Sequence, residues 1–248
     1  MSSHDAAPRA IAGPPDEEPS VPAAVRDVVG DASLAAVWRN DLGGLTWRVG
    51  NDRFLKWAPV TSGLTFADES ERLRWACAYI IVPRVLDAGM SDDGEWLLTA
   101  AIPGDNAVSA RWKGEPLKAA RGIGEGLRAL HDQLPVDGCS FDWSVAARRE
   151  RMTDPTKPLP VEPSIDLLVV CHGDACAPNT LLDEHGRPTG HVDLGRLGLA
   201  DRWADIAIAT YSLGWNFGPG FERDLLDAYG IAPDEKRTAF YRALWDAT

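Results

Sequence analysis

Two neighbouring stretches of the sequence decide the fold: residues 169–179, VVCHGDACAPN, and residues 191–196, HVDLGR. The apolar run at 167–170, LLVV, predicts a buried strand that leads directly into a loop carrying Asp174 and Asn179. A hairpin around the turn residues 183–186 then predicts that Asp193 follows its second strand. We therefore expect Asp174, Asn179 and Asp193 to converge at one edge of a cleft.

The order of these three polar residues is that of the catalytic loop and the metal-binding aspartate of protein kinases. Phosphoryl transfer needs a carboxylate that accepts or orients the proton of the attacking hydroxyl, and oxygen ligands that hold Mg²⁺ on the phosphates. Asp174 is the candidate for the first role, and Asn179 and Asp193 are the candidates for the second.

Two other interpretations of the same residues stay open at this point. Aspartate and asparagine often do no more than stabilise a turn or close a hairpin. Alternatively, Cys171, His172 and Cys176 could bind zinc, although a fourth ligand is missing and the adjacent Cys-His spacing fits tetrahedral coordination poorly.

The residues before this region indicate a small antiparallel sheet. Residues 35–57 alternate apolar segments with turn signals at 40–44 and 50–52, a helix is expected between Phe66 and Ile80, and two further strands are expected at 83–86 and 95–99. Pro103-Gly104 marks a break. We expect a disordered tail at 1–22, a nucleotide-binding N-lobe at 23–103 and a catalytic C-lobe at 104–248.

The second lobe is expected to be mostly helical. Pro116 is suited to the first position of a helix that continues to Leu134, and residues 201–245 have a helical pattern with a Gly/Pro-rich break at 214–220. The prolines between 153 and 163 predict an irregular connector. The expected fold class is α+β.

Lys56 lies inside an otherwise apolar strand, and Glu69 lies on the apolar face of the helix that follows. An ion pair between them would explain both, because an unpaired charge is costly to bury. A solvent-facing lysine and a glutamate at a helix N-terminus explain them equally well. No GxxxxGK[ST] motif occurs, so residues 40–45 are the remaining candidate for a loop over phosphates, whereas Gly122, Gly124 and Gly126 fall within a helix.

Composition limits the classes of partner. The chain has 248 residues, a formal net charge of −12 and a pI near 4.8, which favours a small cationic ligand and argues against nucleic acid and membrane surfaces. The four cysteines form no CxxC pair, and the first segment has no basic stretch followed by an apolar one, as a signal peptide would have. Both observations predict a cytoplasmic protein. We expect a monomer or a weak dimer.

Residues 169–179 and 193–207 resemble the aminoglycoside O-phosphotransferases of the three-prime-hydroxyl type, with weaker likeness over 53–134 and 229–245. The resemblance implies a protein-kinase-like two-lobe fold, ATP (or GTP) with Mg²⁺ in an interlobe cleft, and transfer to an antibiotic hydroxyl. For the chemical step, it implies that Asp174 is catalytic, that Arg196 stabilises charge on the phosphoryl group, and that Asn179 and Asp193 bind magnesium. For the nucleotide, it implies that Lys56 and its ion-pair partner Glu69 bind phosphate, and that the backbone of Ala100 to Ile102 holds adenine.

Two regions depart from that family. A short proline-rich connector at 150–166 stands where the family has a longer acidic hairpin, and the C-terminus is less acidic, leaving Asp246 and the carboxylate of Thr248 as amine-binding candidates. The alternatives are therefore a kinase of another small hydroxyl or amino-alcohol compound, and a catalytically silent nucleotide-binding protein.

Overall fold

The computed structural model describes residues 12–13, 15, 17–40 and 42–248. These residues form two compact units, the first containing the described residues up to Ser70 together with Arg84–Ala101, and the second containing Glu71–Pro83 and Ile102–Thr248. The expected lobe limits at 22/23 and 103/104 stay predictions. Most of the predicted tail lies outside the described residues, and within it Ala12–Gly13 forms a short strand.

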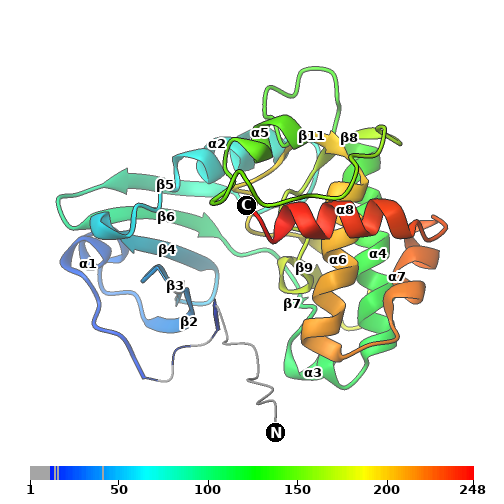
Figure 1. Cartoon of the computed structure of the whole chain (residues 1–248). Coiled ribbons are helices and arrows are strands. Elements are labelled where there is room, and N and C mark those ends of the chain that lie inside the picture. Colours follow the sequence, from blue (N-terminus) through cyan, green and yellow to red (C-terminus); the bar gives the residue numbers. More distant parts are fainter. Residues whose placement is uncertain (1–11, 14, 16, 41) are drawn as a thin grey trace, which may run out of the picture. The chain divides into compact units, whose positions relative to one another are not determined.

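The first unit contains a six-stranded antiparallel sheet (Figure 1). The strands, in the order in which they lie side by side, are β1 (Ala12–Gly13), β2 (Leu34–Asn40), β3 (Leu45–Val49), β4 (Arg53–Pro59), β6 (Gly94–Ala100) and β5 (Val85–Met90). Tight turns join neighbours: Gly50, between β3 and β4, has a φ of +59°, which suits glycine. A 3-10 turn, η1 (Val60–Ser62), follows β4, and helix α2 (Ala67–Ala76) begins in this unit.

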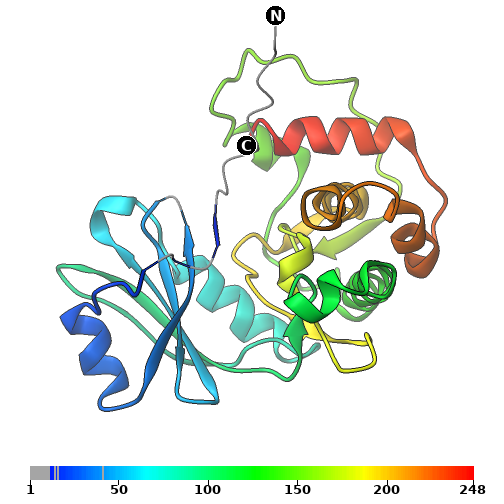
Figure 2. The same ribbon diagram turned by 90° about the horizontal axis from the view of Figure 1, so that it is seen from below.

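A helix that was not expected from the sequence, α1 (Ala23–Val29), covers one face of the sheet (Figure 2). Its buried residues Val25 and Val29 pack with Trp47 and Leu55. Leu55 and Lys56 are neighbours on β4, and because side chains alternate along a strand, Lys56 projects from the opposite face.

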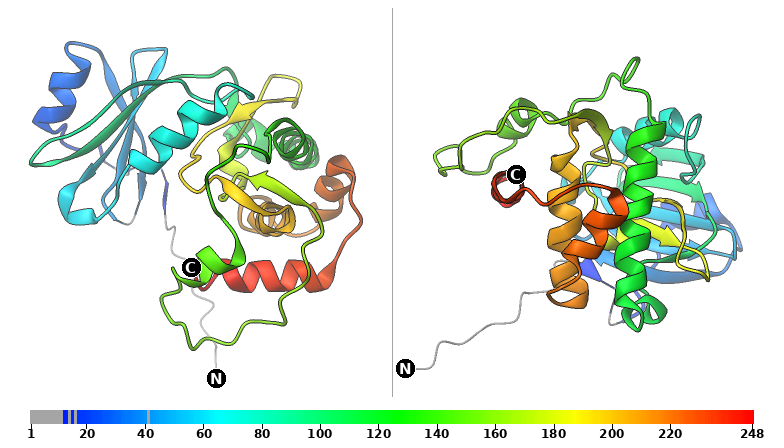
Figure 3. Two further views of the ribbon diagram at one scale, coloured as in Figure 1. Left: turned by 90° about the horizontal axis from the view of Figure 1, so that it is seen from above. Right: turned by 90° about the vertical axis from the view of Figure 1, so that its right-hand side faces the viewer.

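The second unit is mainly helical, as expected (Figure 3). Its helices are α3 (Ala110–Lys113), α4 (Pro116–Gln133), α5 (Val145–Arg149), α6 (Trp203–Phe217), α7 (Glu222–Tyr229) and α8 (Glu235–Trp245). Helices α4, α6 and α7 run side by side and α8 crosses them (Figure 1). The glycines of α4 permit this packing: a Cβ on Gly124 would collide with the Leu225 carbonyl oxygen of α7.

Two small sheets complete this unit. One has the order β10 (Pro188–His191), β9 (Thr180–Leu182), β7 (Asp105–Asn106), and the other pairs β11 (Gly198–Asp201) with β8 (Leu168–Cys171). The buried strand and the hairpin expected from the sequence are therefore present, with a one-turn 3-10 helix, η2 (Ala177–Asn179), between them. Within the described residues, none of the helices combines the length and the apolar character needed to cross a membrane.

Candidate active site

The loop that follows β8 is anchored by a carboxylate from α6. Asp205 is completely buried, and its two oxygens accept hydrogen bonds from the backbone N–H groups of His172 at 2.5 Å and Gly173 at 2.9 Å. His131 of α4 donates to the same carboxylate through Nε2 at 3.0 Å, and its Nδ1 lies 2.8 Å from the hydroxyl of Tyr229. The loop is thus fixed to two core helices.

Burial by itself raises the pKa of Asp205, but the hydrogen bond and charge of His131, followed by those of His172, outweigh it and hold the pKa below its ordinary value. Asp205 is therefore ionised when the protein is folded at neutral pH.

His172 ties the same loop to the end of β10. The backbone N–H of Asp174 donates to His172 Nδ1 at 3.3 Å, and His172 Nε2 donates to the carbonyl oxygen of Val192 at 3.0 Å. These partners place the proton of the ring on Nε2. Gly173 has a φ of +82°, and a Cβ there would collide with the carbonyl oxygen of Arg196. Only glycine lets the two loops approach this closely.

Asp174, Asn179 and Asp193 are brought together by these contacts. Asn179 donates through Nδ2 to the carbonyl oxygen of Asp174 at 2.9 Å, and the N–H of Val192 donates to the carbonyl oxygen of Asn179 at 3.0 Å. Asp193 has a φ of +66°, and among the described residues it is the one non-glycine residue with a positive φ. Such backbone strain is concentrated at functional sites because the surrounding structure must hold it in place.

Asp174 is held in an unfavourable electrostatic environment. Its Oδ1 is buried and has no hydrogen-bond partner among the described residues. Burial, and next the negative charge of Asp193, raise the pKa of Asp174, while the positive charge of Arg196 acts in the opposite direction. Two nearby carboxylates and an unsatisfied oxygen are an arrangement that a bound cation, or the proton of a substrate hydroxyl, would stabilise.

The donor atoms fit a hard divalent cation. Asp193 supplies a carboxylate, and Asn179 supplies an amide oxygen, because its Nδ2 is already engaged with the carbonyl oxygen of Asp174. Mg²⁺ prefers such oxygen ligands and usually keeps several water molecules. These residues would hold the ion, which would supply charge neutralisation at the phosphates when bound.

The structure also contains the ion pair between Lys56 of β4 and Glu69 of α2, in the first unit. Lys56 Nζ lies 2.7 Å from Glu69 Oε1 and 2.8 Å from Oε2, and the side chains are 25% and 8% exposed. Lys56 and Glu69 therefore form an ion pair, and are not two separate solvent-facing charges. The sequence alone did not decide between these two arrangements. The assignment of this pair to phosphate binding stays a prediction.

Ala100 and Ile102 bracket the division between the two units. The N–H of Ala100 donates to the carbonyl oxygen of Arg84 at 2.9 Å, and the N–H of Ala101 donates to that of Asp52 at 2.7 Å. Within the described part of the chain, the N–H of Ile102 donates no hydrogen bond. It is thus a backbone donor that could bind the edge of an adenine ring.

The C-terminus and the connector contact each other. Thr153 donates from its backbone to the carbonyl oxygen of Ala247 at 3.2 Å, and Lys157 Nζ donates to that of Asp246 at 3.1 Å. The Asp246 side chain is exposed, whereas the hydroxyl of Thr248 donates to the carbonyl oxygen of Leu244 at 3.0 Å. Both residues are at the end of α8, and their role in amine binding stays a prediction.

The zinc interpretation gains no support. In the described residues, the group with metal-ligand geometry is His131, Cys171 and Asp205, and not Cys171, His172 and Cys176. His131 and Asp205 already bind each other, and burial raises the pKa of both Cys171 and Cys176 well above the ordinary thiol value. Thiolates, the ligands that zinc requires, are therefore disfavoured.

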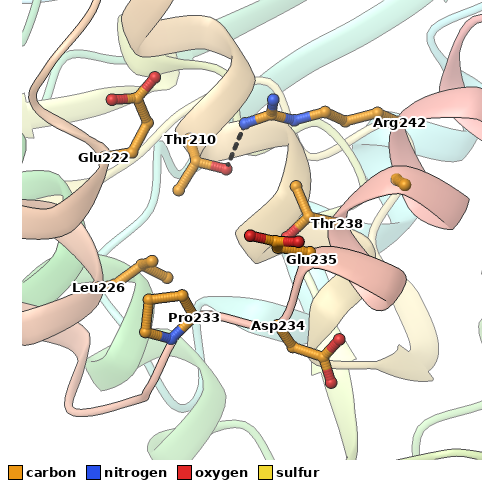
Figure 4. A pocket seen from close by; sticks show the side chains of 9 residues that line it. Thr210, Glu222, Leu226, Pro233, Asp234, Glu235, Thr238 and Arg242 are labelled. Carbon is orange, nitrogen blue, oxygen red and sulfur yellow. Dashed lines mark hydrogen bonds between the residues drawn. The ribbon is translucent and has the colours of Figure 1, made fainter.

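A pocket of about 380 Å³ lies between α6, α7 and α8 and contains none of the predicted site residues (Figure 4). Its lining residues are Thr210, Glu222, Leu226, Pro233, Asp234, Glu235, Thr238, Ala239 and Arg242. Arg242 donates to the hydroxyl of Thr210 at 3.0 Å and to the carbonyl oxygen of Ala207 at 3.2 Å. In this pocket Arg242 therefore fastens α8 to α6.

Some supporting residues were not predicted. Ser212 of α6 accepts a hydrogen bond from the N–H of Ala177 at 2.9 Å and so holds the far side of the catalytic loop. Trp143 and Trp245, over whose rings the Arg196 guanidinium lies, were not predicted either. The spacing of Asp205 and Ser212, seven residues apart on one face of α6, was the available signal for Ser212, whereas no local pattern indicates the two tryptophans.

A kinase-type loop that brings Asp174, Asn179 and Asp193 together, in an α+β chain, is the arrangement of a phosphotransferase that uses an alcohol group as acceptor. Residues 161–241 match the model of the phosphotransferase enzyme family. An aminoglycoside 3'-phosphotransferase of Streptomyces ribosidificus is 37% identical over 82% of this chain and 91% of its own. A streptomycin 3''-kinase of Streptomyces griseus is 33% identical over 83% and 89%.

A solved relative has the same fold. The aminoglycoside phosphotransferase APH(3'')-Id of Streptomyces rimosus, in complex with ADP and streptomycin, superimposes with a TM-score of 0.70 at 29% identity, over 90% of this chain and 96% of that one. The chain belongs to the aminoglycoside phosphotransferase family and has its protein-kinase-like fold. The resemblance noted in the sequence is thereby confirmed.

Proposed function

We propose that this protein transfers the γ-phosphoryl group of ATP to a hydroxyl of an aminoglycoside in a magnesium-dependent reaction, and so confers antibiotic resistance. The observation that carries the proposal is the convergence of Asp174, Asn179, Asp193 and Arg196 around one loop. The negative net charge of −12 favours the approach of a polycationic acceptor.

Each of these residues has a role that its surroundings support. Asp174 accepts the proton of the acceptor hydroxyl as the oxygen attacks phosphorus, because its unpartnered Oδ1 is available and its pKa is raised. Asn179 and Asp193 hold magnesium. Arg196 brings a permanent positive charge toward the transferring phosphoryl group.

The nucleotide side of the proposal rests on the first unit. Lys56, oriented by Glu69, binds phosphate oxygens, and the backbone at Ala100 and Ile102 holds the base. The complex of the Streptomyces rimosus relative with ADP supports an adenine nucleotide, while GTP remains to be compared directly. A cytoplasmic location and a monomer or weak dimer stay predictions.

A second candidate is a kinase of another small amino alcohol or sugar. It is favoured by the connector at 150–166, which has no helix or strand from residue 153 onward, where the resemblance implies a longer acidic hairpin in the family. A silent nucleotide-binding protein is the remaining alternative. The relatives phosphorylate either the 3' or the 3'' position according to their names, so the hydroxyl must be found by experiment.

The test is magnesium- and nucleotide-dependent ADP release with kanamycin, neomycin, streptomycin and a panel of amino alcohols and sugars. We expect turnover on at least one aminoglycoside, phosphate incorporation into that compound by mass spectrometry, and a raised inhibitory concentration in bacteria that express the protein. Asp174→Asn is the matched control and should lower all three at least about 10²-fold. Turnover confined to amino alcohols, or none with nucleotide still bound, would refute the proposal.

A further inference from the structure

Arg196 is held in an unusual way for an exposed arginine beside a catalytic loop. Its backbone carbonyl abuts Gly173, and its guanidinium lies over two tryptophan rings, 5.7 Å from the centroid of Trp143 and 5.3 Å from that of Trp245. The charge of Asp174 attracts this guanidinium, and the two rings are the contacts that fix its position.

Both rings are firmly placed in the second unit. Trp143 is 3% exposed and belongs to the core. Trp245 is the last residue of α8, one turn after Arg242, which fastens that helix to Ala207 and Thr210 of α6 (Figure 4). Arg242 also lies 4.8 Å from the ring centroid of Tyr211. The end of α8 is therefore fixed relative to the helix that anchors the catalytic loop.

The charges around Trp143 show why Arg196 needs these contacts. Arg148 is fully buried, and Arg148 and Arg151 lie over the same ring at 5.0 and 5.4 Å. The like charge of Arg148 disfavours a second guanidinium nearby, whereas the negative face of an indole ring attracts it. Indole is the most effective ring for this interaction, and a flexible arginine loses side-chain freedom when it is sandwiched.

We propose that Trp143 and Trp245 are positioning residues that hold the guanidinium of Arg196 in place for phosphoryl transfer. The last helix of the chain thereby controls the chemical step without touching the reacting atoms. The kinetic consequence of this inference rests on the proposed function. The contact of Arg196 with the two tryptophan rings, here called the clamp, can be tested without turnover.

The main variant is Trp245→Leu, because Trp245 is partly exposed and leucine keeps the apolar packing while removing the aromatic face. Trp245→Phe is the matched control, since it retains an aromatic ring. We expect kcat to fall about tenfold in the leucine variant, with the KM for ATP nearly unchanged, and much less in the phenylalanine variant. Thermal unfolding should show both variants folded.

The dependence on Arg196 is tested in a double-mutant cycle. In an Arg196→Ala background, Trp245→Leu should have no further effect on kcat, because its target is gone. A further loss of the same size in that background, or equal effects of leucine and phenylalanine, would overturn the proposal.

A measurement independent of activity separates this inference from the proposed function. In protein labelled with ¹³C-arginine, the Arg196 Cδ protons, assigned with Arg196→Lys, should be shifted upfield by the ring currents of the two tryptophans. Trp245→Leu should move them toward ordinary arginine values. An unshifted Arg196 signal in the unmodified protein would refute the clamp, whether or not any aminoglycoside is phosphorylated.

Discussion

The loop at 171–179 and the connector at 150–166 belong to the same unit, yet they are constructed in opposite ways. In the loop, backbone N–H groups are bound by Asp205 and Ser212, and most residues are buried or half-buried. In the connector, Val161 is 94% exposed and Ile165 is 64% exposed. Residues 155, 158, 160 and 163 there are prolines, which cannot donate backbone hydrogen bonds.

This difference separates chemistry from recognition. The loop has one well-defined geometry because its buried polar groups are nearly all satisfied, and a change in any partner should be costly. The first part of the connector is tied to the chain end, by Thr153 and Lys157, and its last part is tied to Asp201 and Arg202 by Asp166. We therefore expect substitutions in the loop to change the rate or the stability strongly, and substitutions in the connector to change acceptor preference weakly.

The largest effect should come from Asp174→Asn. Loss of the proton acceptor should lower kcat by about 10²- to 10⁴-fold. Because burial and the charge of Asp193 raise the pKa of Asp174, its ionised form costs folding free energy at neutral pH.

The same variant should therefore be at least as stable as the parent at pH 7 in a metal-free buffer. This difference in stability should vanish below pH 3.8, the ordinary pKa of an aspartate, because Asp174 of the parent is then protonated in both the folded and the unfolded state. Chemical denaturation at several pH values, beside a kinetic assay, measures both. An unchanged kcat would remove Asp174 from its catalytic role.

The next effect in size concerns Asp205, which anchors the loop at 171–179 to α6. Asp205→Ala should lower the free energy of unfolding by about 3–5 kcal/mol, because it removes the partner of a buried His131 and of two backbone N–H groups. The pKa of Asp205 is lowered in the folded protein, so its stabilisation is complete at neutral pH and is lost as the pH falls through the folded pKa.

The stability gap between parent and Asp205→Ala should thus narrow below pH 3.8, as urea titrations would show. Asp224→Ala is the matched control: Asp224 pairs with Arg121, whose side chain is 59% exposed, and its loss should cost less than about 1 kcal/mol. Equal losses in the two variants would argue against the anchoring role.

The Lys56–Glu69 pair should give an intermediate effect. Lys56→Met should reduce kcat/KM for ATP by about 10²-fold if the pair binds phosphate. It should also cost about 1–3 kcal/mol of stability, less than for a fully buried pair because Lys56 is 25% exposed.

The double variant Lys56→Met/Glu69→Gln tests the pair itself. It should regain part of the stability that the single variant loses, because it removes the charge that was left behind, and yet its kcat/KM for ATP should stay as low as that of Lys56→Met. Isothermal titration with ATP and thermal unfolding measure the two quantities. Unimpaired ATP binding in Lys56→Met would refute the phosphate-binding role.

Features that depend on residues close together in the sequence could be predicted from it, whereas contacts between distant residues could not. The strand at 168–171, its loop and the hairpin at 180–191 follow from short-range patterns, and the hairpin reverses the chain so that Asp193 returns toward Asp174. The pairing of β11 with β8 joins Gly198 to Cys171 across a long stretch of chain, and no local pattern specifies it.

The same holds at the site. Spacing alone placed Asn179 and Asp193 beside Asp174, whereas the positive φ of Asp193 arises from the tertiary structure around it. The contact of Arg196 with Trp245 depends on how α8 crosses α6, which periodicity does not encode.

The smallest effect is expected in the connector, where Val161→Asp would add one exposed negative charge. A solvent-exposed carboxylate attracts a polycationic acceptor only weakly at physiological salt, so the KM for an aminoglycoside should fall by no more than about threefold. Val161→Ser is the neutral control, and both variants should keep kcat and remain within about 0.5 kcal/mol of the parent in stability, because Val161 is 94% exposed. Steady-state kinetics at two salt concentrations decides the matter: a gain that disappears at high salt places the connector beside the bound acceptor, whereas identical KM values for aspartate and serine place the acceptor elsewhere.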